Sequence, residues 1–259
     1  MAHSGHQPKC CLLDRYTVIQ KTRAIVLHSI KYQENSLIAH CYAEQLGRMS
    51  VLVQGAFGSG RRPSRAMMYQ PFSVLNMVLY RSNRSTLHRV REAELHLHPR
   101  TIPFDPQKRS IALFLSEIIY KVVREEQPDP ALFCFVEDYI AQLDNQIDGV
   151  PNSHLGFLGQ LIVRIGFSPL NRWSAQTPYL DYRSGMFVAL RPTHGFHFEP
   201  EQSELIDSAL DASNGGLVQR PLNHSQRRQI MDGLLQYLQY HLGDRLDVAS
   251  LPILASVFH

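Results

Sequence analysis

Short runs of alternating apolar and polar residues dominate residues 22–95 of the chain. The runs are rich in Val, Ile, Leu and Tyr, and turn-forming residues separate them, as at 45–47 and 82–83. Alternation with a period of two between turn formers predicts antiparallel strands. The five predicted strands are TRAIVLHSI, SLIAHCYAE, RMSVLVQGA, FSVLNMVLY and STLHRVREAEL. Five strands in about 75 residues suit a small closed barrel, and the OB-fold is its common nucleic-acid-binding form.

Beyond Pro103 the apolar residues follow the 3.6-residue period of helices. Apolar positions three and four apart form one face of residues 108–126, which predicts an amphipathic helix. Asp129 and Pro130 predict the N-cap and the first position of a second helix, because an Asp side chain accepts the free N–H groups there. Further helices are predicted over 153–165, near 200–212, near 225–242 with Ser225 as its cap, and at the C-terminus.

Residues 167–198 interrupt the helical pattern with aromatic residues, Pro and Gly, and a hairpin turn is predicted at 182–185. We therefore predict an α+β fold with two domains, since 259 residues are enough for two cores. The predicted parts are a flexible leader at 1–20, a five-stranded OB-fold β-barrel at 21–100, and an α-helical domain at 101–259 with a small irregular or β insertion at about 167–198.

The composition is typical of a soluble globular protein. Apolar residues make up 44% of the chain and charged residues 19%, without a run of 18 apolar residues, so no membrane span is expected. The first 20 residues lack the features of a signal peptide, which makes the cytoplasm the default compartment. The four cysteines form neither a CxxC pair nor a disulfide framework, and we interpret them as ordinary thiols.

Charge is distributed unevenly along the chain. Residues 20–100 hold twelve Lys and Arg against four Glu, whereas residues 101–259 hold twelve basic residues against eighteen acidic ones. The net charge of +3 therefore hides a basic module joined to an acidic one. This asymmetry indicates that the first module contacts a polyanion.

A loop rich in Gly and Arg follows the third predicted strand at residues 54–65. Its Arg61, Arg62 and Arg65 can pair with phosphate oxygens, because the guanidinium fork binds phosphate bidentately and without reading base sequence. Phe57 lies in the same loop, where it has no core to fill, so we favour it for stacking on a base. The alternative is a solvated surface loop.

The same loop has the GxxxxG spacing of a phosphate-binding loop between Gly55 and Gly60. Such a loop needs Lys and then Ser or Thr at the next two positions, and this chain has Arg61 and Arg62 there. Pro63 would also interrupt the helix that should follow. We therefore reject nucleotide hydrolysis at this loop.

Four more arginines lie on or between the last two predicted strands: Arg81, Arg84, Arg89 and Arg91. Arg89 and Arg91 are two residues apart, so their side chains should point to the same face of the strand. These arginines extend the predicted basic surface beyond the loop. Most tyrosines of the module are interpreted as core residues.

Histidine is abundant, and His96 with His98 and His194 with His197 are the closest pairs. Neither pair has an apparent third and fourth ligand nearby, so surface or partly buried histidines are favoured over a zinc site. The sequence also shows no Ser/His/Asp ordering, paired carboxylate motif or HExxH. We expect no catalytic residue, no bound metal and no cofactor.

Residues 225–231 begin an amphipathic helix in which Arg227 and Arg228 stand beside apolar residues. This combination can hold an acidic peptide with a hydrophobic tip. On this segment alone, an ordinary helix with a solvated basic end is the favoured interpretation, because charge on an exposed helix face is common.

The order of several short motifs carries a resemblance to a known family. The motifs are the AIVL opening, KYxExS, an acidic turn before GR, VxG before a basic loop, QPF and a closing EAEL. The later segments LSEIIYKVVREEQPDPALF and SLPILASVF continue the match. Over residues 20–259 the chain thus resembles the RecO family of DNA repair and recombination mediators.

The resemblance implies a non-enzymatic protein with an N-terminal OB barrel and a helical C-terminal domain. It implies binding to single-stranded and double-stranded DNA, annealing of complementary strands, and work with RecR. Contact with the C-terminal tail of single-strand-binding protein and an indirect role in loading RecA are implied as well. The basic DNA-binding surface that it implies includes Lys31, Arg48, Arg61, Arg62 and Arg65.

Some members of that family hold a four-cysteine zinc site in the segment between helices. Residues 167–198 of this chain contain no cysteine, so we predict no structural zinc. Packing of Trp173, Tyr179, Tyr182 and Phe187 should hold the insertion instead.

Two other functions remain open from the residues. A protein-interaction scaffold whose basic barrel binds RNA or another acidic partner would show the same charge asymmetry. An enzyme with an active site assembled from distant residues would show no local motif.

Overall fold

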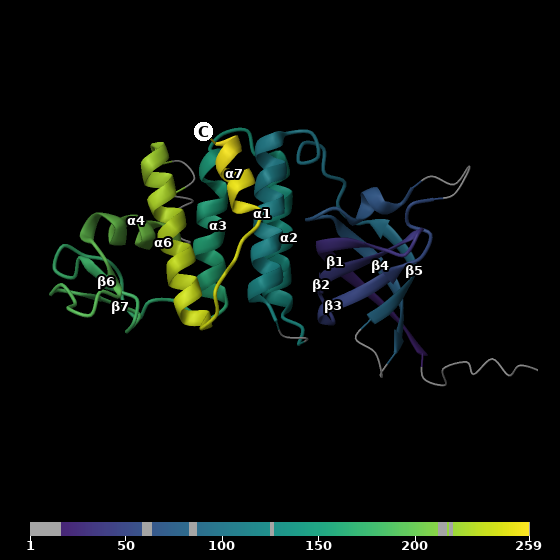
Figure 1. Cartoon of the computed structure of the whole chain (residues 1–259), viewed down its shortest axis with the longest axis horizontal. Helices are drawn as coiled ribbons and strands as arrows, with labels where there is room; N and C mark the ends of the chain where they lie inside the picture. Colours follow the sequence, from purple (N-terminus) through teal and green to yellow (C-terminus); the bar gives the residue numbers. More distant parts are fainter. Residues whose placement is uncertain are drawn as a thin grey trace, which may run out of the picture.

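The computed structural model describes residues 17–58, 64–82, 87–124, 127–211, 217 and 220–258. A five-stranded sheet lies beside a layer of helices, and a small three-stranded sheet lies at the far side of the helices (Figure 1). The mixed α+β class that the sequence predicts is confirmed. Within the described ranges, no helix is long and apolar enough to cross a membrane.

All five strands predicted from the alternating pattern are present. They are β1 (Thr17–Tyr32), β2 (Ser36–Ala43), β3 (Gly47–Val53), β4 (Val74–Ser82) and β5 (Leu87–Leu95), with a short 3-10 helix η1 (Ala66–Tyr69) after β3. The strands pair in the order β1-β2-β3-β5-β4, and β4 pairs back with β1, so the sheet closes on itself. Only the β3–β5 pair is parallel. We call this element the closed sheet.

Strand β1 begins at Thr17, so residues 17–20 belong to the sheet and not to the predicted flexible leader. The reason is closure: β1 pairs with β4 through its first half and with β2 through its second half, and it must be long enough for both. A register shift between Val26 and His28 marks a bulge, which bends the strand from one partner to the other. Residues 1–16 lie outside the described part of the chain.

Alternation along the strands fills the inside of the closed sheet. Small and medium apolar side chains such as Ala39, Cys41 and Val51 point inward and are fully buried, which leaves the next residues in sequence outside. Burial raises the pKa of the Cys41 thiol to about 12, so this cysteine is an inert core residue.

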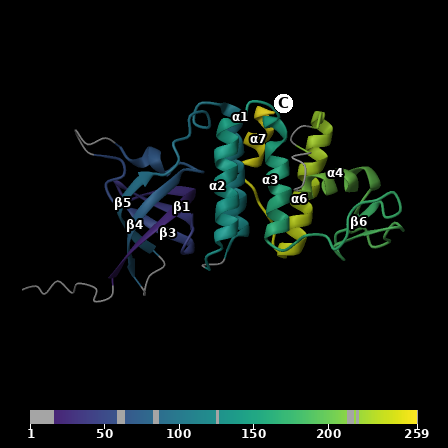
Figure 2. The same cartoon turned by 180° about the vertical axis from the view of Figure 1, so that it is seen from behind.

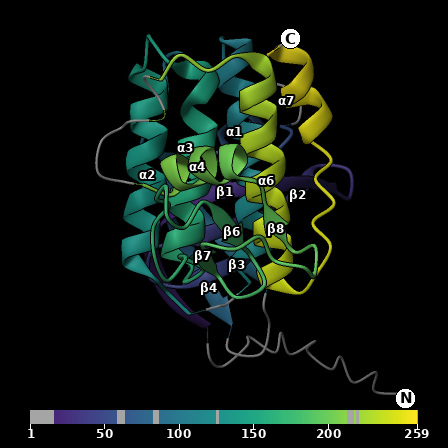
Figure 3. The same cartoon turned by 90° about the vertical axis from the view of Figure 1, so that its left-hand side faces the viewer.

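The helices follow the predicted pattern with shifted ends. They are α1 (Pro106–Val122), α2 (Pro130–Asn145), α3 (Val150–Arg164), α4 (Pro200–Leu210), α6 (His224–Leu242) and α7 (Leu251–Val257). Seen from the insertion side, α4 crosses the other, upright helices (Figure 3). The predicted cap of α2 is confirmed, because the Asp129 carboxylate accepts a hydrogen bond from the Leu132 amide.

Two predicted helix ends are wrong. Helix α6 is capped by Asn223 and not by Ser225: the Asn223 side chain accepts from the Gln226 amide while the Gln226 side chain accepts from the Asn223 amide. Helix α1 ends at Val122 and not at 126, because Val123 takes an extended backbone that leads the chain toward the closed sheet. There the Val123 carbonyl accepts a hydrogen bond from Arg48.

The insertion forms the small sheet from β6 (Tyr179–Asp181), β7 (Met186–Val188) and β8 (His197–Phe198), in the order β7-β6-β8. The predicted turn at 182–185 is confirmed, and the Asp181 carboxylate accepts from Arg183 and Ser184 within it. Of the four aromatic residues expected to hold the insertion, Tyr182 and Phe187 are buried. The other two, Trp173 and Tyr179, are only half-buried.

One hydrophobic cluster runs across the junction between the closed sheet and the helices. It contains outward-facing residues of the sheet, among them Ile25, Leu27 and Tyr42, together with residues of α1 and α2. The view from behind shows α2 and α1 directly beside the closed sheet (Figure 2). The helices therefore cover one part of the sheet's outer face and leave the rest open.

Candidate nucleic-acid interface

The open part of the outer face carries a row of apolar, aromatic and basic side chains. The row runs across all five strands, and each member is the cross-strand partner of the next. Its members are Ile30, Ile38, Leu52, Arg89, Tyr80 and Ile19. Paired residues project to the same side of a sheet, so these side chains form a continuous row. Ile30, Tyr80 and Ile19 are 42%, 39% and 52% exposed. A water-facing sheet normally carries polar residues at such positions, so this row indicates a contact surface.

A loop at one end of this row brings four of the predicted residues together. The Gln54 carbonyl accepts a hydrogen bond from Arg65, at 3.3 Å, and the Gln54 side-chain oxygen accepts one from Arg89, at 2.8 Å. Three residues further on, the Phe57 ring lies under the Lys31 ammonium, with the nitrogen 5.6 Å from the ring centroid. We call residues 54–58 with these three basic side chains the basic loop cluster.

The base of this loop is fixed by backbone hydrogen bonds. The buried Ala56 carbonyl accepts from the Arg65 amide at 2.7 Å, from the Ala66 amide at 3.0 Å, and from the Ser64 hydroxyl at 3.1 Å. Gly55 has a φ of +64°, a left-handed conformation that glycine adopts without strain and that turns the chain out of β3. The two ends of the Gly- and Arg-rich segment are thereby held side by side.

The positive charges of the cluster are not neutralised by the protein in its described part. Among the residues that the structure describes, no Asp or Glu carboxylate forms an ion pair with Lys31, Arg65 or Arg89. Phe57 is 39% exposed, although it carries a large apolar ring. Unpaired cations beside an exposed ring can meet a phosphate and a base of one strand together.

Other predicted residues are not part of this cluster. The Arg48 guanidinium lies on the part of the sheet beside α1, 4.3 Å from the Tyr120 ring centroid. Arg81 pairs with Val18 at the start of β1, whereas Lys31 is at the end of the same strand. Arg61, Arg62 and Arg84 lie outside the described residues.

Arg89 and Arg91 are both exposed, but Arg91 lies at a bulge that interrupts the alternation from which a shared face was predicted, and the basic surface ends there. A bulge in β5 at this position shifts the register, so the next exposed residues on the strand are Glu92 and Glu94. Arg91 itself forms an ion pair with Glu92 at 3.1 Å. Gln54, which joins two of the arginines, was not predicted from the sequence, because no local pattern marks it.

The second predicted site is a pocket of about 380 Å³ between α6, α7 and α3. Both Arg227 and Arg228 line it, together with apolar side chains that include Met231 and Leu254. Arg227 is half-buried and donates to the Leu222 carbonyl, whereas Arg228 is exposed and lies 3.7 Å from Asp232. The pocket thus combines an apolar floor with two guanidinium groups.

His154 forms part of the wall of the same pocket and is buried. The ring of Phe258, near the end of the chain, stacks on it with centroids 5.6 Å apart. Burial, and then the charge of Arg227, lower the pKa of His154 to about 3. His154 is therefore neutral at physiological pH, and the positive charge of the pocket comes from the two arginines.

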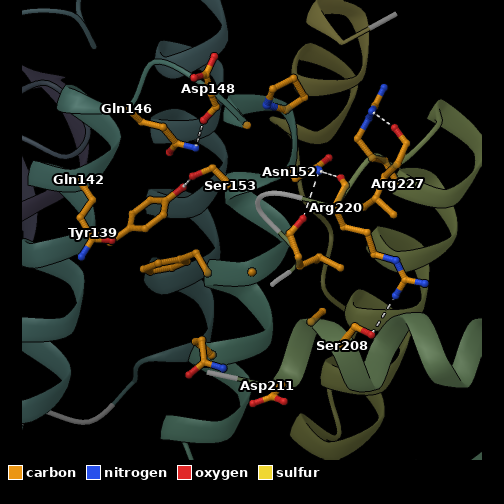
Figure 4. Close-up of a pocket in the computed structure, with 18 of the residues that line it drawn as sticks. Tyr139, Gln142, Gln146, Asp148, Asn152, Ser153, Ser208, Asp211, Arg220 and Arg227 are labelled. Atoms are coloured by element: carbon orange, nitrogen blue, oxygen red, sulfur yellow. Dashed lines mark hydrogen bonds between the residues drawn. The ribbon is translucent and has the colours of Figure 1, made fainter. Parts of the chain in front are cut away.

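A larger pocket of about 980 Å³ lies between α2, α3, α4 and the segment around Arg220 (Figure 4). Its polar groups are largely engaged: Tyr139 and Ser153 share a hydrogen bond of 2.8 Å, and Asn152 donates to the Arg220 carbonyl. Arg220 in turn donates to Ser208. The described residues contain no group of three His, Cys, Asp or Glu that could hold a metal ion.

Comparisons with known proteins agree with this arrangement. The family model described as "Recombination protein O N terminal" matches residues 18–97, and "Recombination protein O C terminal" matches residues 103–248. A DNA repair protein RecO from Phocaeicola vulgatus is 30% identical over 93% of this chain and 100% of its own length. Proteins of the same name from Flavobacterium psychrophilum and Porphyromonas gingivalis are each 33% identical, over 92% and 85% of this chain and 98% and 91% of their own lengths.

Proposed function

The chain belongs to the RecO family of DNA repair proteins, and from that premise we propose that it binds single-stranded DNA through the closed sheet without catalysing a reaction. The basic loop cluster carries this proposal. It places three cations without a described carboxylate partner beside an exposed phenylalanine, at the end of an exposed apolar row. Phosphates would pair with the cations while bases stack on the ring.

We assign the closed sheet to the OB-fold as part of this proposal. Five strands, a long first strand that pairs on both sides, and one parallel pair between β3 and β5 support the assignment. When cross-strand partners are followed once around the sheet, the path begins at Ile30 and returns to the same strand at Ile19. The strands are therefore strongly staggered relative to one another. An OB-fold binds nucleic acids on the outer face of its strands and the adjoining loops.

The finer role that we propose is that of a recombination mediator in the cytoplasm, where the chromosome lies. The protein would anneal complementary strands and, together with RecR, help RecA to load onto DNA covered by single-strand-binding protein. The pocket with Arg227 and Arg228 suits the acidic, hydrophobic-tipped tail of that protein, because its apolar floor can take the tip and its arginines the carboxylates.

Fluorescence anisotropy of labelled oligothymidylate over a salt series tests the DNA-binding proposal. The triple variant Lys31→Ala, Arg65→Ala, Arg89→Ala should bind more weakly, and its plot of log K against log salt should be shallower by about 2, since each phosphate contact contributes about 0.7 for a single strand. The matched control removes three exposed arginines of the helical part, Arg109, Arg183 and Arg245, and should keep the wild-type slope. Equal slopes of log K against log salt for the two triple variants would show that the basic loop cluster does not contact DNA.

A second measurement separates DNA from the alternative partners. If single-stranded DNA is the ligand, unlabelled RNA of the same length should compete less well than unlabelled DNA. Failure of the wild type to bind either nucleic acid at low salt would favour the protein-interaction scaffold. For the tail pocket, a peptide with acidic residues before a C-terminal aromatic residue should bind the wild type and lose affinity with Arg227→Ala.

A further inference from the structure

Where the closed sheet meets helix α1, four side chains form a compact cluster. The rings of His28 and His40 lie nearly parallel, with centroids 6.1 Å apart and planes 9° apart. The Tyr120 ring contacts both, at 5.8 and 5.2 Å, and the Arg48 guanidinium lies 4.3 Å from the Tyr120 centroid. His28 is exposed and the other three are half-buried, so the cluster is open to solvent on one side. We call it the junction cluster.

The junction cluster continues the exposed row of the sheet's outer face. His28 pairs with His40, and His40 pairs with Ser50. Each of these three residues lies two positions along its own strand from a residue of the row, namely Ile30, Ile38 and Leu52. Residues two apart on a strand point to the same side. A strand of DNA that follows the row toward the helices would therefore reach His28 and His40 next.

We propose that the junction cluster is a further binding site for the single strand, which holds one phosphodiester at the N–H edges of the two stacked imidazoles beside the Arg48 guanidinium. The inference rests on the proposed DNA binding, because the phosphodiester belongs to the same strand. Tyr120 orients the site, since its ring contacts both imidazoles and the guanidinium. The helical part of the protein thus takes part in DNA binding through α1.

The charges around the two imidazoles explain why an anion would bind there. Burial, then His28 and Arg48, lower the pKa of His40, because two protonated rings beside a guanidinium repel one another. The other groups that face His40 are neutral: Ser50, whose hydroxyl lies 2.8 Å from Nδ1, and Tyr120. The nearby Lys121 faces Glu117, at 3.6 Å. A phosphodiester at this site would offset the repulsion and raise the pKa of His40.

Proton uptake on binding gives the site a measurable property. Because the DNA-bound form holds protons that the free protein does not, affinity must rise as the pH falls through the range in which histidine titrates. The phosphodiester and the thymine bases do not titrate in that range, so the effect reports on the protein. We expect wild-type affinity for oligothymidylate to rise about tenfold from about pH 8 to about pH 6 at constant ionic strength.

The test compares the wild type with the double variant His28→Gln, His40→Gln, which keeps polar side chains that cannot titrate. This variant should lose most of the pH dependence, whereas the control His98→Gln, an exposed histidine after β5, should retain it. The single variant His28→Gln changes only an exposed side chain and should lose part of the effect, which keeps the test valid if the double variant unfolds.

The outcomes separate this inference from the proposed function. Identical pH dependence in the wild type and in both His28 variants would overturn the junction site while DNA binding stands. No binding of DNA by the wild type at either pH would overturn the proposed function and the junction site together. Loss of the pH dependence in the variants, with retained binding at about pH 8, supports the site.

Discussion

Arg23 of strand β1 and Glu137 of helix α2 are joined by an ion pair of 2.6 Å that crosses from the closed sheet to the helices. The same guanidinium binds Glu44 through two hydrogen bonds and lies 5.2 Å from the centroid of the Phe133 ring. Hydrogen bonding to Glu44 is the main reason why the pKa of Arg23 is raised, so its charge is permanent. Arg23 thus holds two carboxylates that would otherwise repel each other.

Replacing Arg23 should therefore destabilise the whole chain. Arg23→Met keeps the apolar stem but leaves Glu44 without its counterion and Glu137 with only the His96 ring, 3.5 Å away. We expect the free energy of unfolding to fall by about 2 kcal/mol, less than for a fully buried pair because the Arg23 side chain is 28% exposed. Urea denaturation checks this, with Lys21→Met, an exposed residue of the same strand, as the control. Equal stability of the two variants would contradict the assigned role.

Phe57 should contribute base stacking and no charge. Phe57→Ala is expected to weaken binding of oligothymidylate by on the order of tenfold or more without changing the salt dependence, since a stacked base contributes about 1–3 kcal/mol. Phe57→Trp should retain the affinity. Phe104, which is 82% exposed, provides the control: Phe104→Ala should bind as the wild type does. A shallower salt dependence for Phe57→Ala would show that the substitution displaces the neighbouring cations instead.

His154 should make the protein less stable as the pH falls. Its pKa is lowered to about 3 in the folded protein, while in the unfolded chain it has the ordinary value of 6.5. Below pH 6.5 the unfolded chain binds a proton that the folded one excludes, so the free energy of unfolding drops by up to about 1.4 kcal/mol per pH unit. His154→Leu should remove this part of the pH dependence in urea denaturation between about pH 7 and about pH 5. An unchanged slope in this variant would assign the dependence to other groups.

Gly159 should tolerate no side chain, although it lies in the middle of helix α3. A Cβ atom there would lie 2.1 Å from the carbonyl oxygen of Ala209 in α4, which is backbone and cannot rotate away. In an exposed helix, Gly→Ala stabilises by about 1 kcal/mol, but here α3 and α4 would have to separate. We expect Gly159→Ala to lower the free energy of unfolding by about 3 kcal/mol or more. Thermal denaturation measures this, and a variant as stable as the wild type would disprove the close crossing.

Much of the fold could be predicted from local patterns. The alternating runs that contain Ala39 and Val51 predicted strands β2 and β3, and Asp129 followed by Pro130 predicted the start of α2. Such patterns work because the interactions behind them span few residues: a cap bonds to the next turn, and alternation follows from the pleat. The Ser225 prediction was wrong for the same reason, since Asn223 is an equally good cap two residues earlier and has Gln226 to complete the box.

The candidate interface was only partly predictable. Lys31, Phe57, Arg65 and Arg89 were all named from the sequence, but their meeting at one loop depends on Gln54, which no motif marks. Arg89 reaches the loop through the pairing of β3 with β5, two strands that are distant in sequence, and Lys31 through the pairing of β1 with β2 and of β2 with β3. Arg81, on the next strand, belongs to the other end of β1.

By itself, the sequence determined the element types and the basic first module, because periodicity, capping and net charge are properties of near neighbours. Only the tertiary structure decided which charges act together. Shifts of one residue, at the bulge beside Val26 and at Arg91, turn every following side chain to the opposite face. The shift at Arg91 lets Glu92 end the basic surface, and the pairing of Arg48 with Tyr42 puts the guanidinium on the side of the sheet that α1 covers. Strand register is set by partners far along the chain, and a local pattern does not contain it.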